Sequence, residues 1–177
     1  MDEIIIIGAG GHGKVIADAI IKLGKYELKG FVDAQIPIGN IIFNGYKVIE
    51  NQQNIESLIN QSTKFVFGIG NNEVRKNLKN RLSEKIEWAT IIHPKAVIAQ
   101  DVEIGVGSVV LANTIINAGS TIGEFTIIDS GTIVDHDCEI GDFNHLTIGT
   151  LVGSNSKLKI SGLKTELGQV YQPFTNL

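Results

Sequence analysis

Residues 116–141 read INAGSTIGEFTIIDSGTIVDHDCEIG, and this stretch repeats with a period of six. An aliphatic side chain recurs at every sixth position, and the same column continues beyond the stretch in both directions. Its members are Ile98, Ile104, Val110, Ile116, Ile122, Ile128, Val134, Ile140, Leu146, Val152 and Leu158. A small or short side chain follows four positions after most of them. An α-helix repeats about every 3.6 residues and a strand about every two, so neither element alone explains the pattern.

A six-residue repeat is typical of a parallel β-solenoid, in which short strands joined by tight corners stack coil upon coil. We therefore expect the aliphatic column to point inward. Glycine directly follows the column residue at Gly105, Gly123, Gly141 and Gly153, which predicts corners where a side chain would crowd the turn. The repeat predicts an all-β domain of a little under four coils over residues 93–161. Such a thin column is a small core, so we also expect a partner subunit and an oligomer.

Composition and charge exclude several classes of protein. The chain has 177 residues, 43% of them hydrophobic and 19% charged, which fits one or two globular domains. A net charge of −4 without a basic run argues against nonspecific nucleic-acid binding. No basic leader and no apolar run of about 20 residues occur, so we expect a cytoplasmic protein with no membrane contact. The single cysteine, Cys138, stands at a small-residue position of the repeat and is expected in the core rather than as a nucleophile.

The N-terminal part predicts a small α/β domain. The apolar strand Ile4–Ile7 leads into Gly8-Ala9-Gly10-Gly11-His12-Gly13 and a helical pattern that ends at Gly24. Asp33 closes the next strand, twenty residues after Gly13. This is the G-x-G-x-x-G fingerprint, in which a glycine loop and a helix N-terminus receive a diphosphate. The candidate ligand-binding residues are Gly8, Gly10, Gly11, His12, Gly13 and Asp33; the alternative is that the glycines serve only tight packing of strand against helix.

A second strand-to-helix turn follows at Gly70-Asn71. A buried strand is expected at 64–68 and a helix at 73–83, with Val74, Leu78 and Leu82 on its packed face. Open α/β sheets bind ligands at the carboxyl ends of their strands, so Gly70 and Asn71 are candidate ligand contacts, with a plain turn as the alternative.

The first domain is expected to span residues 1–92. A last strand is predicted over 86–92, and His93-Pro94 marks the junction because proline cannot continue a central strand. This length is too short for two mononucleotide-binding halves. A nicotinamide-dependent dehydrogenase is therefore not favoured.

One segment of the repeat carries chemistry, the run Asp135-His136-Asp137-Cys138-Glu139 and the nearby His145. Both histidines are expected to point outward from the coil. Asp135 or Asp137 would fix the tautomer of His136 and raise its basicity, as a general base requires. A zinc site built from His93, His136 and His145 is the rival interpretation, but no close histidine pair appears in the sequence, and we expect no metal.

The residues at three places together resemble the bacterial sugar acetyltransferases. The family motifs are matched by Ile7-Gly8-Ala9-Gly10-Gly11-His12-Gly13-Lys14-Val15, by Gly68-Ile69-Gly70-Asn71-Asn72-Glu73-Val74-Arg75, and by hexapeptides that contain Asp135-His136-Asp137-Cys138-Glu139-Ile140-Gly141. The family includes nucleotide 4-amino-sugar N-acetyltransferases and sialic acid O-acetyltransferases. The resemblance covers roughly residues 3–153.

The resemblance implies a Rossmann-like domain that holds a nucleotide sugar and a left-handed parallel β-helix that forms trimers and binds acetyl-CoA. It implies that His136 is the general base, that Asp137 supports it, and that His145 lies near the acetyl-CoA thioester. The glycine loop, Asp33, Gly70 and Asn71 match the sugar side. A backbone N–H near the corner at Gly153 is the candidate oxyanion donor.

Two departures from the family pattern change the expectations. Asp129 stands where the family usually has an asparagine that helps to position the acceptor, so N- and O-acetylation both remain open. After Gly153 the repeat loses its glycine and breaks at Lys164, so residues 162–177 are expected to form a short irregular tail. Later coils that complete the donor site would then be missing. The alternative function is a nucleotide-sugar-binding or scaffold protein that has lost catalysis.

Overall fold

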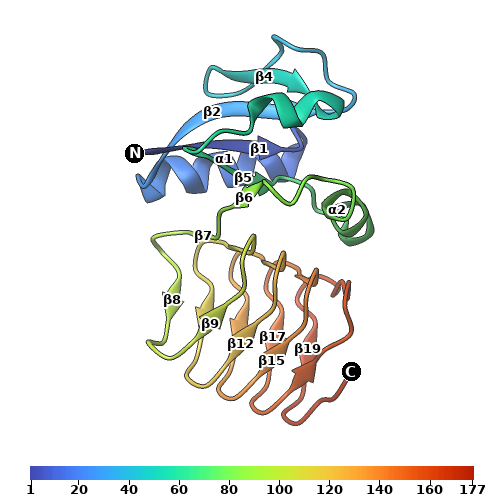
Figure 1. Cartoon of the computed structure of the whole chain (residues 1–177). Coiled ribbons are helices and arrows are strands. Elements are labelled where there is room, and N and C mark those ends of the chain that lie inside the picture. The colour runs from blue at the N-terminus through green and yellow to red at the C-terminus, as the bar shows by residue number, and fades with distance from the viewer.

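The computed structural model describes residues 1–177 and contains two domains, an α/β domain seated on the side of a β-helix (Figure 1). The α/β domain is built from β1 (Asp2–Ile7), α1 (Gly11–Leu23), β2 (Tyr26–Asp33), β3 (Ile41–Phe43), β4 (Tyr46–Asn51), the 3-10 helix η1 (Gln52–Leu58), β5 (Thr63–Phe67), α2 (Asn72–Lys79) and β6 (Glu87–Trp88).

The sheet of this domain has the order β3-β4-β2-β1-β5-β6 and is parallel except for β3. Its centre is β1, whose last four residues are fully apolar and buried, as a strand covered on both faces requires. β3 and β4 form a hairpin that turns at Asn44-Gly45, and both of these residues have positive φ. The strand order places the ends of β1 and β5 side by side, so the glycine loop and the Gly70 turn are neighbours.

The β-helix is left-handed and triangular, with short strands on three faces. The covered face, which lies under the α/β domain, holds β7 (Ile91–Ile92), β10 (Val109–Val110), β13 (Ile127–Ile128) and β16 (His145–Leu146). The apolar face holds β8 (Val97–Ile98), β11 (Ile115–Ile116), β14 (Ile133–Val134), β17 (Leu151–Val152) and β19 (Val170–Tyr171). The polar face holds β9 (Glu103–Ile104), β12 (Thr121–Ile122), β15 (Glu139–Ile140) and β18 (Lys157–Leu158).

The six-residue pattern explains the interior of the β-helix. The aliphatic column fills the core as predicted. The small residues satisfy corner carbonyls of the next coil: the hydroxyls of Ser108, Ser120 and Thr126 donate to carbonyl oxygens fifteen residues later. A Cβ on Gly123 would lie 2.6 Å from backbone atoms of the following coil, so the corner glycines are required by close stacking.

Residues 162–177 do not form the irregular tail that the sequence predicted. They build most of a further coil, in which β19 pairs with β17 and Lys164 pairs with His145. The partners in this coil are 19 residues apart instead of 18, because one residue is inserted between Leu158 and Thr165. After the insertion the column resumes its period at Thr165, Tyr171 and Leu177, and Lys164 faces outward beside it.

The expected strand over 86–92 is also two separate strands. β6 pairs with β5 in the α/β sheet, whereas β7 pairs with β10 and is the first strand of the β-helix. The connection between the domains therefore lies near residue 90.

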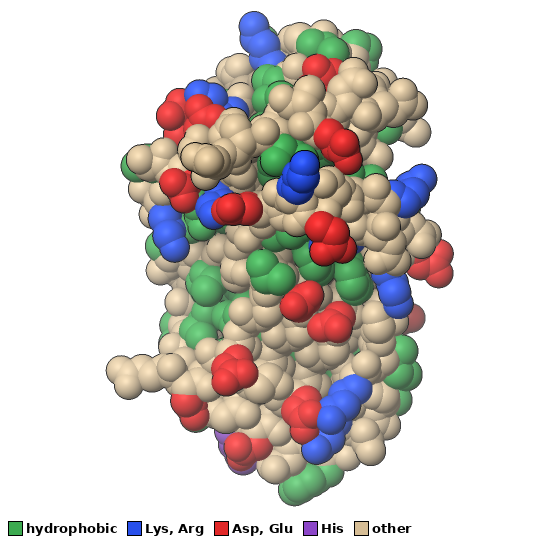
Figure 2. Space-filling view, in the orientation of Figure 1, with side chains coloured by type: hydrophobic (Ala, Val, Ile, Leu, Met, Phe, Trp, Pro, Cys, Tyr) green, Lys and Arg blue, Asp and Glu red, His purple; other side chains and the backbone are tan.

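A shared hydrophobic core joins the two domains. Ile16 and Ile20 of α1 belong to the same buried cluster as Ile91, Val109 and Leu111 from the covered face. In the view of Figure 2, hydrophobic side chains gather along this junction, while charged side chains of both signs are spread over the surfaces above and below it. The two domains are thus packed as one body, which fixes the glycine loop against the β-helix. None of the helices has the length and apolar character needed to cross a membrane.

Candidate active site

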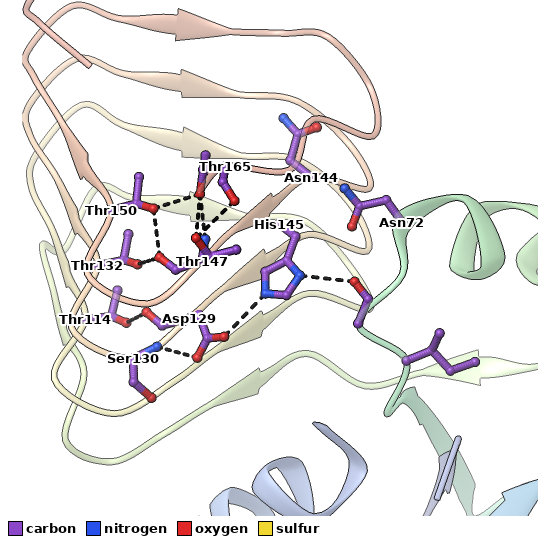
Figure 3. A network of polar contacts seen from close by, with 12 residues as sticks. Asn72, Thr114, Asp129, Ser130, Thr132, Asn144, His145, Thr147, Thr150 and Thr165 are labelled. Atoms are coloured by element: carbon purple, nitrogen blue, oxygen red, sulfur yellow. Dashed lines mark hydrogen bonds and ion pairs between the residues drawn. The ribbon is translucent and has the colours of Figure 1, made fainter. Parts of the chain in front are cut away.

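His145 lies at the junction of the domains, where the Gly70 turn meets the covered face. Its side chain is only 8% exposed. The Nδ1 atom is 3.1 Å from the carbonyl oxygen of Gly70, and the Nε2 atom is 3.3 Å from Oδ2 of Asp129 (Figure 3). The structure therefore brings together three residues that the sequence predicted for the site: His145, Gly70 and Asp129.

Both ring nitrogens of His145 have an oxygen partner. A carbonyl oxygen only accepts hydrogen bonds, so Nδ1 donates to Gly70. Burial raises the pKa of Asp129, but the hydrogen bonds from His145 and from the Ser130 N–H outweigh this effect and hold that pKa below its usual value. An ionised Asp129 also only accepts, so the two acceptors, one beside each ring nitrogen, fix the orientation of the His145 ring.

His12, from the glycine loop, lies beside this pair. Its ring centroid is 5.8 Å from that of His145, so the structure forms the close histidine pair that the sequence did not reveal. Burial, followed by the nearby charge of His145, lowers the pKa of His12 to about 4. Its Nε2 is the one buried side-chain nitrogen or oxygen in the structure without a hydrogen-bond partner. A buried polar atom of this kind is a contact that a ligand can complete.

The glycines of the first loop have two different roles. Gly8 has a φ of 107°, and a Cβ on Gly13 would lie 2.3 Å from the Gly8 carbonyl oxygen, so these two glycines are required for tight packing of the loop against α1. A Cβ on Gly10 or Gly11 would meet nothing within 4 Å. The packing interpretation thus accounts for Gly8 and Gly13, while Gly10 and Gly11 leave the N-terminus of α1 open to a ligand.

Asp33 and Asn71 have structural partners. Asp33 accepts hydrogen bonds from the backbone N–H groups of Ala9, Gln35 and Ile36, at 2.8–3.0 Å. Burial raises its pKa, and these N–H groups more than offset the effect, so the pKa lies below its usual value. Asn71 caps α2 by accepting from the Val74 N–H at 3.0 Å. Both residues therefore shape the loops that border the site.

His136 and Asp137 form a second, separate cluster. They lie at the corner between β14 and β15, where Nδ1 of His136 is 2.7 Å from Oδ2 of Asp137. The hydrogen bond to Asp137 raises the pKa of His136 above its usual value. The imidazole is 52% exposed. Asp135 instead accepts from the His136 backbone N–H at 2.8 Å, so it is Asp137 that holds the ring.

A single chain does not bring the two clusters together. Asp129 precedes β14 on one edge of the apolar face, and His136 follows β14 on the other edge. His145 belongs to β16 on the covered face. The residues predicted for one catalytic site are therefore divided between two corners of the β-helix.

The candidate oxyanion donor was a backbone N–H near the corner at Gly153, and the N–H of Gly153 itself is already hydrogen-bonded within the chain. Its N–H donates to the Tyr171 carbonyl oxygen at 2.9 Å, and a Cβ there would lie 2.6 Å from Pro173 N. The further coil, which the sequence did not reveal, covers this position. Cys138 is buried in the core as predicted, with its thiol 3.3 Å from the Gly153 carbonyl oxygen, and burial raises its pKa. No group of three or more histidine, cysteine or acidic side chains lies close enough to hold a metal ion.

The sequence did not reveal the two polar residues on the buried side of α2. The buried residues of this helix are Asn72, Arg75 and Leu78, whereas Val74, expected on the packed face, is 47% exposed. Arg75 is 1% exposed and contacts both domains. The available signal was the spacing of three between Asn72, Arg75 and Leu78, which places them on one side of a helix.

An α/β domain with a glycine loop, docked on a left-handed hexapeptide β-helix, is the architecture expected of the hexapeptide-repeat sugar acetyltransferases whose motifs the sequence resembles. Comparisons with known proteins agree with this class. Residues 3–82 match the family described as PglD N-terminal domain.

Three relatives make the assignment more specific. The chain is 34% identical over 122 residues to UDP-N-acetylbacillosamine N-acetyltransferase of Bacillus subtilis; the match covers 63% of this chain and 52% of that protein, so the chain spans about half the length of this curated relative. The acetyltransferase domain of PglB from Neisseria gonorrhoeae, solved with acetyl coenzyme A, is 30% identical, with a TM-score of 0.74 and coverage of 97% of this chain and 85% of that chain. A mutant perosamine N-acetyltransferase from Caulobacter crescentus, solved with CoA and GDP-perosamine, is 28% identical, with a TM-score of 0.78 and coverage of 99% and 91%. The chain belongs to this family of nucleotide amino-sugar acetyltransferases.

Proposed function

We propose that the protein transfers the acetyl group of acetyl-CoA to the amine of a nucleotide-linked amino sugar, in the cytoplasm, for surface-glycan synthesis. The observation that carries the proposal is the exposed His136 imidazole, whose Nδ1 is held by Asp137 and whose Nε2 is left for an acceptor. The names of the relatives favour N-acetylation over the O-acetylation of sialic acids.

The chemistry requires one base and no covalent enzyme intermediate. His136 Nε2 takes a proton from the sugar amine as the amine nitrogen attacks the thioester carbonyl carbon. The C–N bond forms, the C–S bond breaks, and the proton on His136 passes to the departing CoA thiolate. Asp137 stabilises the imidazolium that exists between these steps.

The apolar face supports a homotrimer as the working assembly. Its outward side chains are Val97, Ile115, Ile133, Leu151 and Val170, and four of them are 37–64% exposed. The polar face instead carries Glu139 with its ion pairs to Lys157 and Lys159. An unpartnered apolar ladder on one of three faces suits packing against copies of the same chain.

The edges of the apolar face explain why an assembly is needed for activity. His136 lies along one edge, and Asp129 lies along the other. In a head-to-tail ring, the first edge of one copy meets the second edge of the next copy. This arrangement unites the base of one subunit with His145, Asp129 and His12 of its neighbour.

The nucleotide sugar is assigned to the glycine-loop side of that combined site. Gly10 and Gly11 leave the α1 N-terminus open for the diphosphate, and the unpaired Nε2 of His12 lies beside them. Gly8, Gly13, Asp33 and Asn71 hold the two loops in place. The acetyl-CoA thioester is assigned to the vicinity of His145, between neighbouring subunits.

The test is release of CoA thiol from acetyl-CoA with a UDP-linked 4-amino sugar, GDP-perosamine or sialic acid as acceptor. We expect thiol release with a nucleotide amino sugar, and a loss of roughly 10²–10⁴-fold in His136→Ala. Glu124→Gln, at a corner between the polar and covered faces, is the control and should keep full activity. Binding of a nucleotide sugar without thiol release from any acceptor would instead favour the alternative, a sugar-binding protein without catalysis.

A further inference from the structure

The first turn of α2 contacts the same corner of three successive coils. Arg75 Nε donates to the Phe125 carbonyl oxygen at 3.3 Å, and Arg75 Nη2 donates to the Phe143 carbonyl oxygen at 3.0 Å. Asn72 Nδ2 donates to the Gly162 carbonyl oxygen at 2.9 Å. Phe125, Phe143 and Gly162 are equivalent corner residues, with φ values of 52°, 55° and 83°. Two side chains of α2 thus span these coils along the β-helix axis.

Arg75 is unusual as a buried cation without a carboxylate. Its remaining bonds go to the carbonyl oxygens of Ile69 and Asn144 and to Oδ1 of Asn72. Burial lowers its pKa to about 10, so the guanidinium stays charged at neutral pH. The Arg75 guanidinium is rigid and planar, and its hydrogen bonds go to oxygens of both domains. Because these bonds need fixed directions, they restrict the relative position of the domains more strictly than apolar contact does.

The corner residues that accept hydrogen bonds from Arg75 are themselves packed by aromatic contacts. The rings of Phe125 and Phe143 stack at 5.1 Å and 14°, and Trp88 of the α/β domain contacts Phe125 edge-on at 5.2 Å. The inserted residue of the last coil brings Gly162 to the third position of the series, where a glycine readily adopts the positive φ. The further coil therefore belongs to the docking surface of α2.

The network leads directly to the site. Arg75 Nη1 donates to the Ile69 carbonyl oxygen at 3.0 Å, and the carbonyl oxygen of the next residue, Gly70, accepts from His145 Nδ1. We propose that Asn72 and Arg75 are positioning residues. They fix the position of the Gly70 turn along the β-helix axis, so that the carbonyl group of Gly70 orients the His145 ring. The expected effect on KM rests on the proposed acetyl transfer, whereas the expected effect on the hydrogen bond between His145 and Gly70 does not.

The decisive measurement is the imidazole N–H signal of His145 in protein labelled with ¹⁵N-histidine. A slowly exchanging Nδ1–H is expected in the native chain and in the control Arg81→Met, which removes an exposed arginine that follows α2. Arg75→Met should lose this signal while circular dichroism shows that the β-helix is retained. If Arg75→Met does not fold, Arg75→Lys and Asn72→Leu replace it, because Arg75→Lys keeps the charge but not the planar guanidinium and Asn72→Leu removes the contact with Gly162.

A second measurement separates positioning from simple stabilisation. In Arg75→Lys we expect KM for acetyl-CoA, whose thioester is assigned to the vicinity of His145, to rise roughly tenfold, while KM for the nucleotide sugar, assigned to the glycine loop, stays within about twofold. A lower melting temperature with an unchanged His145 signal and unchanged KM values would overturn the proposal. Absence of activity in every variant, with the Nδ1–H lost only when Asn72 or Arg75 is changed, would refute the proposed reaction and leave the positioning role intact.

Discussion

Nδ1 of His136 lies 2.7 Å from Oδ2 of Asp137, the residue that follows it, and Asp137 adopts a φ of 57° at this corner. A non-glycine residue in the left-handed region is uncommon, although aspartate tolerates it better than most. The corner therefore aims a carboxylate at the inner nitrogen of the ring and leaves the outer nitrogen exposed.

Asp137→Asn should shift the pH dependence of acetyl transfer. The base must be neutral to accept a proton, and the hydrogen bond to Asp137 raises the pKa of His136, so the acid limb of kcat/KM lies above the usual value near 6.5. Removing the negative charge lowers that pKa, and the acid limb moves to lower pH. A pH profile of kcat/KM measures the shift; an unmoved limb would show that Asp137 does not tune the base.

Gly119→Ala should impair catalysis without contact with any substrate. Gly119 is the corner residue one coil before Asp137, and a Cβ there would lie 2.3 Å from Asp137 Oδ1. The carboxylate must swing away from His136, and the φ of 73° adds strain for alanine. We expect a fall of roughly tenfold or more in kcat with a small loss of stability. Gly131→Ala is the matched control, because Gly131 has a φ of 71° with nothing within 4 Å. Equal activity of the two variants would contradict this prediction.

A charge on the apolar face should dissociate the proposed trimer. Ile133 and Leu151 are 37% and 40% exposed at the middle of the ladder. The double variant Ile133→Lys, Leu151→Lys should give a folded monomer by light scattering, and activity should fall with assembly because the two clusters then remain apart. Thr121→Lys, on the polar face, should leave the mass unchanged. A monomeric native chain with full activity would refute the shared site.

The repeat of aliphatic residues made the β-helix predictable, because a column such as Ile116, Ile122 and Ile128 has no other common explanation. The further coil was hidden for a physical reason. A single inserted residue shifts the register, and the column position then holds Thr165, whose hydroxyl lies 3.0 Å from the Thr147 hydroxyl and 2.8 Å from that of Thr150. A threonine at a column position looks like a surface residue when the sequence is considered alone.

The sequence points to the residues of the candidate site one by one, but it does not predict their arrangement. The glycine loop and His136 follow from local patterns, since each motif is continuous in the chain. The contacts of His145 with Gly70 and His12 depend on how the two domains dock, and this docking rests on Arg75, which lies 50 and 68 residues from Phe125 and Phe143. No local pattern reports contacts over that separation.

His12 should make the fold sensitive to acid. Its pKa is about 4 in the folded chain and near 6.5 when unfolded, so the unfolded chain takes up a proton first as the pH falls. Its contribution is fully present above about pH 6.5 and is lost as the pH falls toward 4. The shift corresponds to as much as about 3 kcal/mol of unfolding free energy.

Urea unfolding at pH 7.5 and pH 4.5 measures this loss, because all other titrating groups are common to the native chain and His12→Gln. The variant should lose less stability between the two pH values than the native chain does. His136→Gln is the control for removal of a histidine, since the pKa of His136 is shifted in the opposite direction. An equal loss in the native chain and in His12→Gln would mean that the buried ring takes up its proton without unfolding, and that the unpaired Nε2 faces a space that water can enter.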